Sequence, residues 1–157
     1  MSRENLPYRK NCEGYLLCNG KVIARNTGQG YVVFPGGGVD EGETPKEALT
    51  REAMEETGAI IDGELKELGV IHFDWDENWA KTDKQKERYQ KFRGEEMHLF
   101  SGEVTQMVEP TNPEDAWPDE PTMSIQQAIN IIKSEPFSKS MEEYRNAQLA
   151  ALESLKS

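Results

Sequence analysis

The sequence predicts an α/β domain in which helices pack against a mixed β-sheet. Its 157 residues suit one domain, residues 1–157, and contain no internal repeat or inter-domain linker. Apolar residues make up 36% of the chain and charged residues 30%, so the chain is polar but still rich enough in core-forming residues to fold. Segments with strand and helix character alternate irregularly along the chain, which favours helices packed on a mixed sheet.

The first elements are expected to be a hairpin and a short strand. Residues 15–25, YLLCNGKVIAR, place an Asn-Gly dipeptide between two apolar runs, and this is the strongest short-range hairpin signal. Residues 31–34, YVVF, are β-branched and aromatic and predict a short strand. The glycine-rich stretch PGGGVDEGE that follows predicts a loop.

A helix is expected over residues 45–57. Thr44 can cap its first turn, Pro45 suits the first helical position, and Glu47 can complete a capping box. Gly58 is well placed to end the helix.

The second half of the chain predicts two longer strands, two helices and two irregular segments. In chain order we expect a strand over residues 67–75, a polar insert over 76–95, a strand over 96–108 with a bend at Gly102, a proline-rich loop or lid over 109–122, a short amphipathic helix over 123–133 begun by Ser124, and a longer helix over 138–156. The expected core contacts of the last helix are Met141, Tyr144, Leu149 and Leu152.

Several classes of protein are disfavoured by composition. No apolar run approaches the roughly 20 residues that span a bilayer, and the polar N-terminal segment lacks a secretory signal, so we expect no membrane partner and a cytoplasmic location. Cys12 and Cys18 lie six residues apart on one predicted strand and are expected to be reduced thiols. A formal net charge of −11 argues against general nucleic-acid binding and is compatible with attracting divalent cations.

The helix over residues 45–57 carries an unusual cluster of acidic side chains. Glu52, Glu55 and Glu56 share one face and lie near the C-terminal end, where the helix dipole disfavours negative charge. Arg51 offers an i, i+4 partner to Glu55 only. The cluster is either a solvated acidic face, at a cost under about 1 kcal/mol, or a set of oxygen ligands for a hard cation such as Mg²⁺.

The spacing around this helix resembles a family signature. From Gly37 the chain runs through five residues to Glu43, then seven residues to Arg51, and then REAMEETGA. This pattern resembles the Nudix hydrolase signature, G-x5-E-x7-R-E-U-x-E-E-x-G-U, where U is a bulky aliphatic residue. Every glycine and charged position is present, and the preceding FPG is similar to the family's usual approach. The two departures are Ala53 and Ala59 at the aliphatic positions.

The resemblance implies a Nudix-type α/β/α sandwich around a mixed sheet. It also implies hydrolysis of a nucleoside diphosphate linked to another moiety, such as a nucleoside triphosphate, ADP-ribose, a nucleotide sugar or a dinucleoside polyphosphate. Water would attack phosphorus with the help of Mg²⁺, or of Mn²⁺ as a substitute. The partner would be a small nucleotide-type diphosphate, and many relatives form homodimers.

The resemblance also assigns roles to individual residues. The implied metal ligands are the side chains of Glu52, Glu55 and Glu56 and the backbone carbonyl of Gly36. Either Glu52 or Glu55 would double as general base, and Glu43 and Arg51 would form a pair that holds loop against helix. The family often adds an acid from a late loop, and among Glu109, Glu114, Asp115, Asp119 and Glu120 we select Glu114, although each could equally be a solvated loop acid.

Substrate contacts are expected outside the signature. Residues 81–93 carry six basic residues against two acidic ones, and Lys84, Arg88 and Lys91 would share a helical face that holds a phosphate-rich arm. The alternative is a solvated surface helix. Arg25 is a further candidate phosphate contact. The aromatic residues that could stack on a base, if they are not core residues, are Trp75, Trp79, Tyr89, Phe92 and Trp117.

Other functions remain open at this point. A Nudix-fold binding module would sense a ligand without turnover, and it could lose motif acids that this chain keeps. A diphosphate isomerase on the same fold would need additional acid–base residues. Decapping of an RNA 5′ end is a variant of the hydrolase that the acidic surface disfavours and that the basic residues 81–93 could serve.

Overall fold

The computed structural model describes residues 2–136 and 139–156. The strands are β1 (Tyr8–Cys18), β2 (Lys21–Ile23), β3 (Arg25–Asn26), β4 (Val32–Val33), β5 (Gly36–Gly38), β6 (Ala59–Asp74), β7 (Gly94–Met107) and β8 (Thr122–Met123). The helices are α1 (Pro45–Thr57), α2 (Asp83–Lys91), α3 (Ile125–Ser134) and α4 (Glu142–Ser154), with 3-10 turns η1 (Arg3–Asn5) and η2 (Lys139–Met141).

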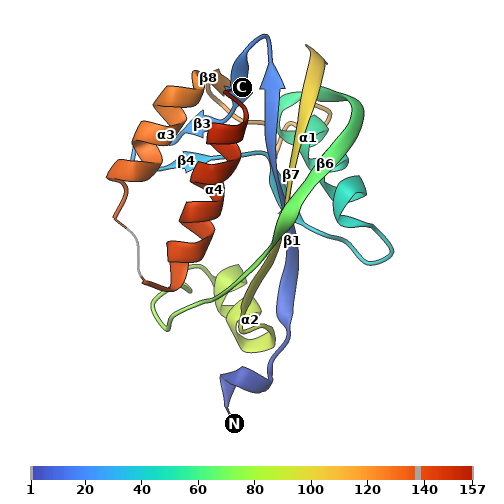
Figure 1. Cartoon of the computed structure of the whole chain (residues 1–157). Helices are drawn as coiled ribbons and strands as arrows, with labels where there is room; N and C mark the ends of the chain where they lie inside the picture. The colour runs from blue at the N-terminus through green and yellow to red at the C-terminus, as the bar shows by residue number, and fades with distance from the viewer. Residues whose placement is uncertain (1, 137–138, 157) are drawn as a thin grey trace.

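The main sheet is mixed, as the sequence predicts. Its strand order is β6-β7-β1-β2-β8, with β5 paired to β1, while β3 and β4 form a separate two-stranded sheet. Strands β1 and β7 are parallel and the other pairs of the main sheet are antiparallel. Helix α1 covers one face and helices α3 and α4 the other, while α2 lies at the end of the sheet beside the N-terminus (Figure 1). The expected α/β architecture is confirmed.

The Asn-Gly hairpin joins β1 to β2. Cys18 pairs with Lys21 across the turn. Asn19 and Gly20 have φ angles of 53° and 79°, which is the left-handed geometry that a type I′ turn requires at both central positions.

Helix α1 has the bounds that its capping residues predict. The Thr44 side chain accepts from the amide of Glu47, and the Glu47 side chain accepts from the amide of Thr44, so the capping box is complete. Gly58 ends the helix in the left-handed conformation with φ 74°. Ala53 and Ala59, at the two aliphatic positions of the signature, are both buried.

The second half of the chain differs from the prediction in length rather than in order. Strand β6 begins earlier than expected because its ladder with β7 continues through three register shifts, which an alternation pattern does not reveal. Strand β7 begins earlier because Gly94 and Glu95 pair with the end of β6 and with the start of β1. The polar insert contains helix α2, capped by Thr82. Helix α3 is capped by Ser124 as expected, whereas α4 starts only at Glu142 after a 3-10 turn; the predicted start at Ser138 lies outside the described residues.

Two apolar cores lie on opposite faces of the sheet. The core under α3 and α4 contains Tyr15, Leu99, Ile129, Tyr144 and Leu152, with Met141 and Leu149 packed at its edge. The core under α1 contains both cysteines, which are free thiols as expected. No helix in the described part of the chain has the length and apolar character needed to cross a membrane.

The core under α4 contains a buried carboxylate that the sequence does not single out. Glu13 on β1 is 7% exposed and accepts hydrogen bonds from the hydroxyl of Tyr15, from the hydroxyl of Tyr144 at 2.5 Å and from Nε2 of Gln148 at 3.2 Å. Burial raises the pKa of Glu13, and these hydrogen bonds act in the opposite direction. The three donors therefore compensate for a carboxylate held inside the fold.

Candidate active site

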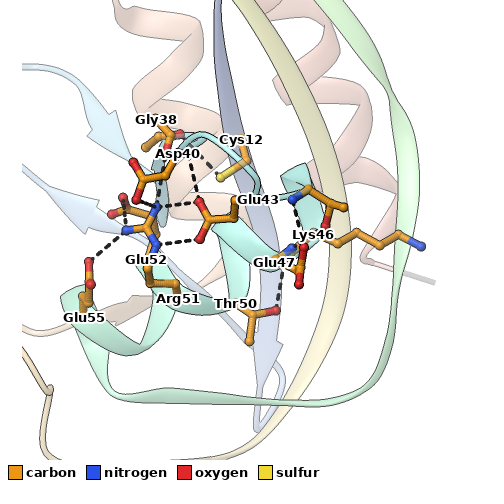
Figure 2. Close-up of polar contacts among 12 residues, drawn as sticks. Cys12, Gly38, Asp40, Glu43, Lys46, Glu47, Thr50, Arg51, Glu52 and Glu55 are labelled. Carbon is orange, nitrogen blue, oxygen red and sulfur yellow. Dashed lines mark hydrogen bonds and ion pairs between the residues drawn. The ribbon is translucent and has the colours of Figure 1, made fainter.

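Arg51 joins α1 to the glycine-rich loop. Its Nε donates to Oε2 of Glu43 at 2.8 Å and its Nη2 to Oε1 at 3.0 Å, which is a bidentate pair. Nη2 also donates to the carbonyl oxygen of Gly38 at 3.2 Å (Figure 2). Hydrogen bonding to Arg51 lowers the pKa of Glu43 to about 2, and the same pair raises the pKa of Arg51. The two side chains that the resemblance pairs are thus in contact, and they tie loop to helix.

Arg51 also contacts two of the clustered acids. Its Nη1 donates to Oε1 of Glu52 at 2.9 Å and to Oε2 of Glu55 at 3.2 Å. The expected i, i+4 pair with Glu55 is confirmed, and the guanidinium also meets Glu52, the next residue on the helix. Figure 2 shows the guanidinium surrounded by these carboxylates and by Asp40, whose Oδ2 lies 3.4 Å away. One arginine thus offsets part of the repulsion among the acids.

Glu56 points away from Arg51 toward the start of the loop. Its Oε1 accepts from the backbone amide of Gly36 at 3.0 Å. Burial raises the pKa of Glu56 to about 8, with further contributions from the negative charges of Glu52 and Asp115. Burial likewise raises the pKa of Glu52. These carboxyl groups are therefore harder to ionise than ordinary ones, because they are partly buried and lie beside other acids.

Strand β5, where the sequence predicts loop, approaches these acids closely because it is built from glycine. A Cβ on Gly37 would lie 2.8 Å from the carboxyl carbon of Glu52, and a Cβ on Gly36 would lie 2.1 Å from the carbonyl oxygen of Cys12. Side chains at either position would push strand β5 away from α1 or from β1. Backbone groups of β5 therefore reach the carboxylates directly.

The carboxylates of Glu52, Glu55 and Glu56 suit a hard divalent cation chemically, although they are not arranged around one shared position. Within residues 2–136 and 139–156, no group of three carboxylate, imidazole or thiol side chains is arranged to hold a metal ion. Glu52 and Glu55 bind Arg51 instead, and Glu56 binds the amide of Gly36. All three nevertheless offer oxygen ligands of the kind that Mg²⁺ prefers, on one helix and beside backbone carbonyls. A cation would have to draw Glu52 and Glu55 away from Arg51.

In the late loop, the charge of Asp115, the neighbour of the selected Glu114, acts on the acidic cluster. The negative charge of Asp115 raises the pKa of both Glu52 and Glu56, so Asp115 lies near the acidic cluster. Glu114 is exposed, and its backbone amide donates to Oδ1 of Asn112. The loop is anchored by the amide of Trp117, which donates to the carbonyl oxygen of Glu56 at 2.9 Å. No spacing rule distinguishes two adjacent acids in a loop, and the role of Glu114 stays a prediction.

The candidate substrate contacts separate in the structure. Arg25 pairs with Asp119 of the late loop at 3.3 Å. Lys84 is exposed and Lys91 pairs with Glu87 at 3.0 Å, whereas Arg88 is half-buried and faces the sheet. The expectation that these α2 side chains bind substrate stays a prediction.

The aromatic residues of the insert belong mainly to the fold. Trp75 is buried and its ring stacks on that of Trp79 with centroids 3.7 Å apart. Tyr89 and Phe92 are partly buried and pack against the core under α4. Trp117 alone packs against the core under α1, next to the acidic cluster.

Solved structures with this architecture are Nudix hydrolases. A NUDIX hydrolase from Nitrosomonas europaea superposes with a TM-score of 0.55 over 92% of this chain and 90% of that one, at 17% identity. The MutT protein from Methanosarcina mazei Go1 superposes with a TM-score of 0.58 over 97% and 95%, at 18% identity. At these identities the likeness defines the fold, which is the Nudix fold.

The family model for the NUDIX domain matches residues 7–144, and the chain belongs to this family. The curated relatives include an RNA pyrophosphohydrolase of Shewanella sediminis, 56% identical over 48 residues, which are 29% of this chain and 28% of that protein. Another, from Tolumonas auensis, is 44% identical over 71 residues, or 43% and 37%. The chain thus spans about a third of the length of the curated relatives it matches.

Proposed function

We propose that the chain is a divalent-metal-dependent pyrophosphohydrolase. It cleaves the diphosphate linkage of a nucleoside diphosphate joined to another moiety by attack of water at phosphorus. The observation that carries this proposal is the complete set of signature acids: Glu52 and Glu55 contact Arg51, and Glu56 accepts from the amide of Gly36 on strand β5. A binding module would have no use for so complete an arrangement.

The cations would be held by the three glutamates and the backbone carbonyl of Gly36. When bound, they supply neutralisation of the phosphate oxygens and activation of water at neutral pH. Mg²⁺ is the expected ion and Mn²⁺ a substitute. Glu52 or Glu55, once released from Arg51, is placed to take the proton of the attacking water, and Glu43 keeps Arg51 in position through its bidentate pair.

Two observations support the proposed substrate class, namely the family and the names of relatives that match part of this chain. The family acts on nucleoside diphosphates with varied second moieties, and relatives that match part of this chain are named RNA pyrophosphohydrolases. RNA with a 5′-triphosphate therefore belongs among the candidates, although a net charge of −11 gives the body of an RNA little to bind. A cytoplasmic location, a single domain over residues 1–157 and homodimer assembly stay predictions.

A turnover assay tests the proposal. The panel contains nucleoside triphosphates, ADP-ribose, nucleotide sugars, dinucleoside polyphosphates, diphosphoinositols and 5′-triphosphate RNA, each with Mg²⁺, with Mn²⁺ and with chelator. Glu55→Gln and Glu56→Gln should each lower kcat by roughly 100-fold or more. Glu64→Gln, an exposed acid on β6, is the matched control and should keep full activity.

Two outcomes would decide against the hydrolase. Tight binding of a panel member without turnover under either metal would favour the sensor module. Metal-dependent turnover that survives both glutamine substitutions would show that the signature acids are not the reactive centre.

A further inference from the structure

A cavity lies between the loop that leads from β6 into α2 and the residues that join α3 to α4. Its volume is about 420 Å³, which is within the range of small-molecule sites. Its lining includes the aromatic rings of Phe73, Trp75 and Trp79 and the charged side chains of Glu135 and Arg145. No residue of the signature lines it. This cavity, the Trp79 cavity, is therefore a site distinct from the acidic cluster.

The aromatic wall of the cavity is already formed. The rings of Trp75 and Trp79 stack with centroids 3.7 Å apart and planes 3° from parallel. The amide of Trp79 donates to the carbonyl oxygen of Asp76 at 3.1 Å, and the amide of Trp75 donates to that of Arg93 at 3.0 Å. Trp75 is 6% exposed whereas Trp79 is only partly buried, so Trp79 is the ring that a ligand meets. A flat wall fixed before binding suits a planar group, because little further ordering is needed.

The charged part of the lining contains unpaired atoms. Nη2 of Arg145 donates to Oε1 of Glu135 at 2.5 Å, and Nη1 donates to Oε1 of Gln148 at 2.6 Å. The side chains of Arg145 and Glu135 are 12% and 13% exposed. Nε of Arg145 and Oε2 of Glu135 are buried and have no hydrogen-bond partner among the described residues, although buried polar atoms are nearly always paired. Because both residues line the cavity, a small rotation of either side chain would present a free donor and a free acceptor to a ligand.

The charge around the cavity argues against an anionic ligand. The lining carries three acidic residues, Asp74, Asp76 and Glu135, and two basic ones, Lys81 and Arg145. Arg145 is already paired with Glu135. Negative charge therefore exceeds positive charge, which disfavours a phosphate group in the cavity and favours an uncharged ligand.

We propose that the Trp79 cavity binds a nucleobase, which stacks on the Trp79 ring and hydrogen-bonds through one edge to Oε2 of Glu135 and Nε of Arg145. Every nucleobase is planar and carries a donor beside an acceptor on its base-pairing edge, which is the pair of groups that these two atoms need. The proposal goes beyond the proposed function, because base binding here needs neither metal nor turnover. The base belongs either to the substrate or to a second nucleotide, and kinetics separate these two sources.

Indole resonances test the cavity in the unmodified protein. The chain has three tryptophans: Trp75 and Trp79 line the cavity, and Trp117 lies in the late loop outside it. Adenosine, guanosine, cytidine and uridine are each titrated into isotope-labelled protein in chelator, with ribose as the probe that lacks a base. Trp117→Phe identifies the signal of Trp117. We expect at least one nucleoside to shift the Nε1–H signals of Trp75 and Trp79 and to leave that of Trp117 in place.

Substitutions then measure what the ring and the ion pair contribute to nucleoside binding in isothermal titration calorimetry. Trp79→Leu removes the stacking surface and should weaken binding by roughly tenfold, the typical loss when a base loses its aromatic partner. Tyr31→Leu, at an exposed ring outside the cavity, is the control and should change binding by less than about twofold. Glu135→Gln turns the free acceptor into an amide donor at nearly constant shape and should weaken binding as well.

Four results would each overturn the proposal: no shift with any nucleoside, a shift of Trp117 alone, equal shifts with ribose, or equal weakening by Trp79→Leu and Tyr31→Leu. Where a panel member is hydrolysed, a nucleoside that raises its KM at unchanged kcat occupies the base position of the substrate. A nucleoside that binds the cavity and changes kcat instead acts as a second nucleotide would. Because the resonances need no turnover, shifts confined to the cavity would stand even if no panel member were hydrolysed.

Discussion

Replacing Glu95 by Gln should change how the stability of the protein depends on pH. Glu95 faces Arg9 and Asn11 from β1, Arg88 from α2 and the negative charge of Glu13. Burial raises its folded pKa to about 7, above the 4.5 of an unperturbed glutamate. Between these values the folded state binds more protons than the unfolded state, so this group's contribution to stability is fully present below pH 4.5 and is lost as the pH rises through 7.

The size of the effect follows from the shift. Each pKa unit corresponds to about 1.4 kcal/mol, so Glu95 should lower the free energy of unfolding by about 2 to 3 kcal/mol between pH 5 and pH 8. The Gln variant cannot ionise and should lack this component while keeping an acceptor for Asn11. Urea unfolding at both pH values measures the difference. Glu103→Gln, an exposed acid on the same strand, is the control and should follow the wild type. An identical pH dependence in Glu95→Gln and the wild type would refute the reasoning.

Two further substitutions test the packing around the site and the core. Gly58→Ala should lower the free energy of unfolding by about 3 kcal/mol, because φ is 74° and the methyl group would lie 1.7 Å from a backbone carbonyl oxygen. Gly42→Ala, where φ is 83° and the space is open, should lower it by only about 1 kcal/mol. Equal losses of stability in thermal unfolding would contradict the argument. Tyr144→Phe removes a donor to the buried Glu13 and should cost about 1 to 3 kcal/mol in urea unfolding. The control is Tyr31→Phe, at an exposed ring, which should lower the free energy of unfolding by under about 0.5 kcal/mol. If Tyr144→Phe lowered it no more than Tyr31→Phe, the hydrogen bond of Tyr144 to Glu13 would contribute nothing to stability.

The elements whose signals are local could be predicted from the sequence. Helix α1 has the predicted bounds because its start and end depend on Thr44, Glu47 and Gly58, which act within one turn of the chain. The Asn-Gly hairpin was predictable for the same reason. The lengths of β6 and β7 were not, because a strand continues as far as its partner offers hydrogen bonds, and the bulges that keep the ladder in register leave no regular pattern.

The candidate site divides in the same way. Within the signature, spacing alone brought Glu43, Arg51 and the three glutamates together, because all lie on one helix and the loop before it. Contacts between distant segments escaped prediction. Asp115 acts on the acids from a loop without regular structure. Two of the three donors to Glu13, Tyr144 and Gln148, come from a helix 131 and 135 residues later.

By itself the sequence determined the family, the acidic helix and the loop that faces it, since these depend on residues within about 25 positions of one another. Only the tertiary structure decided which charges outside the signature act together. Arg9 and Glu95 meet because β1 and β7 pair in parallel. Charge interactions depend on separation in space and on burial, and neither is written in the spacing of residues along the chain.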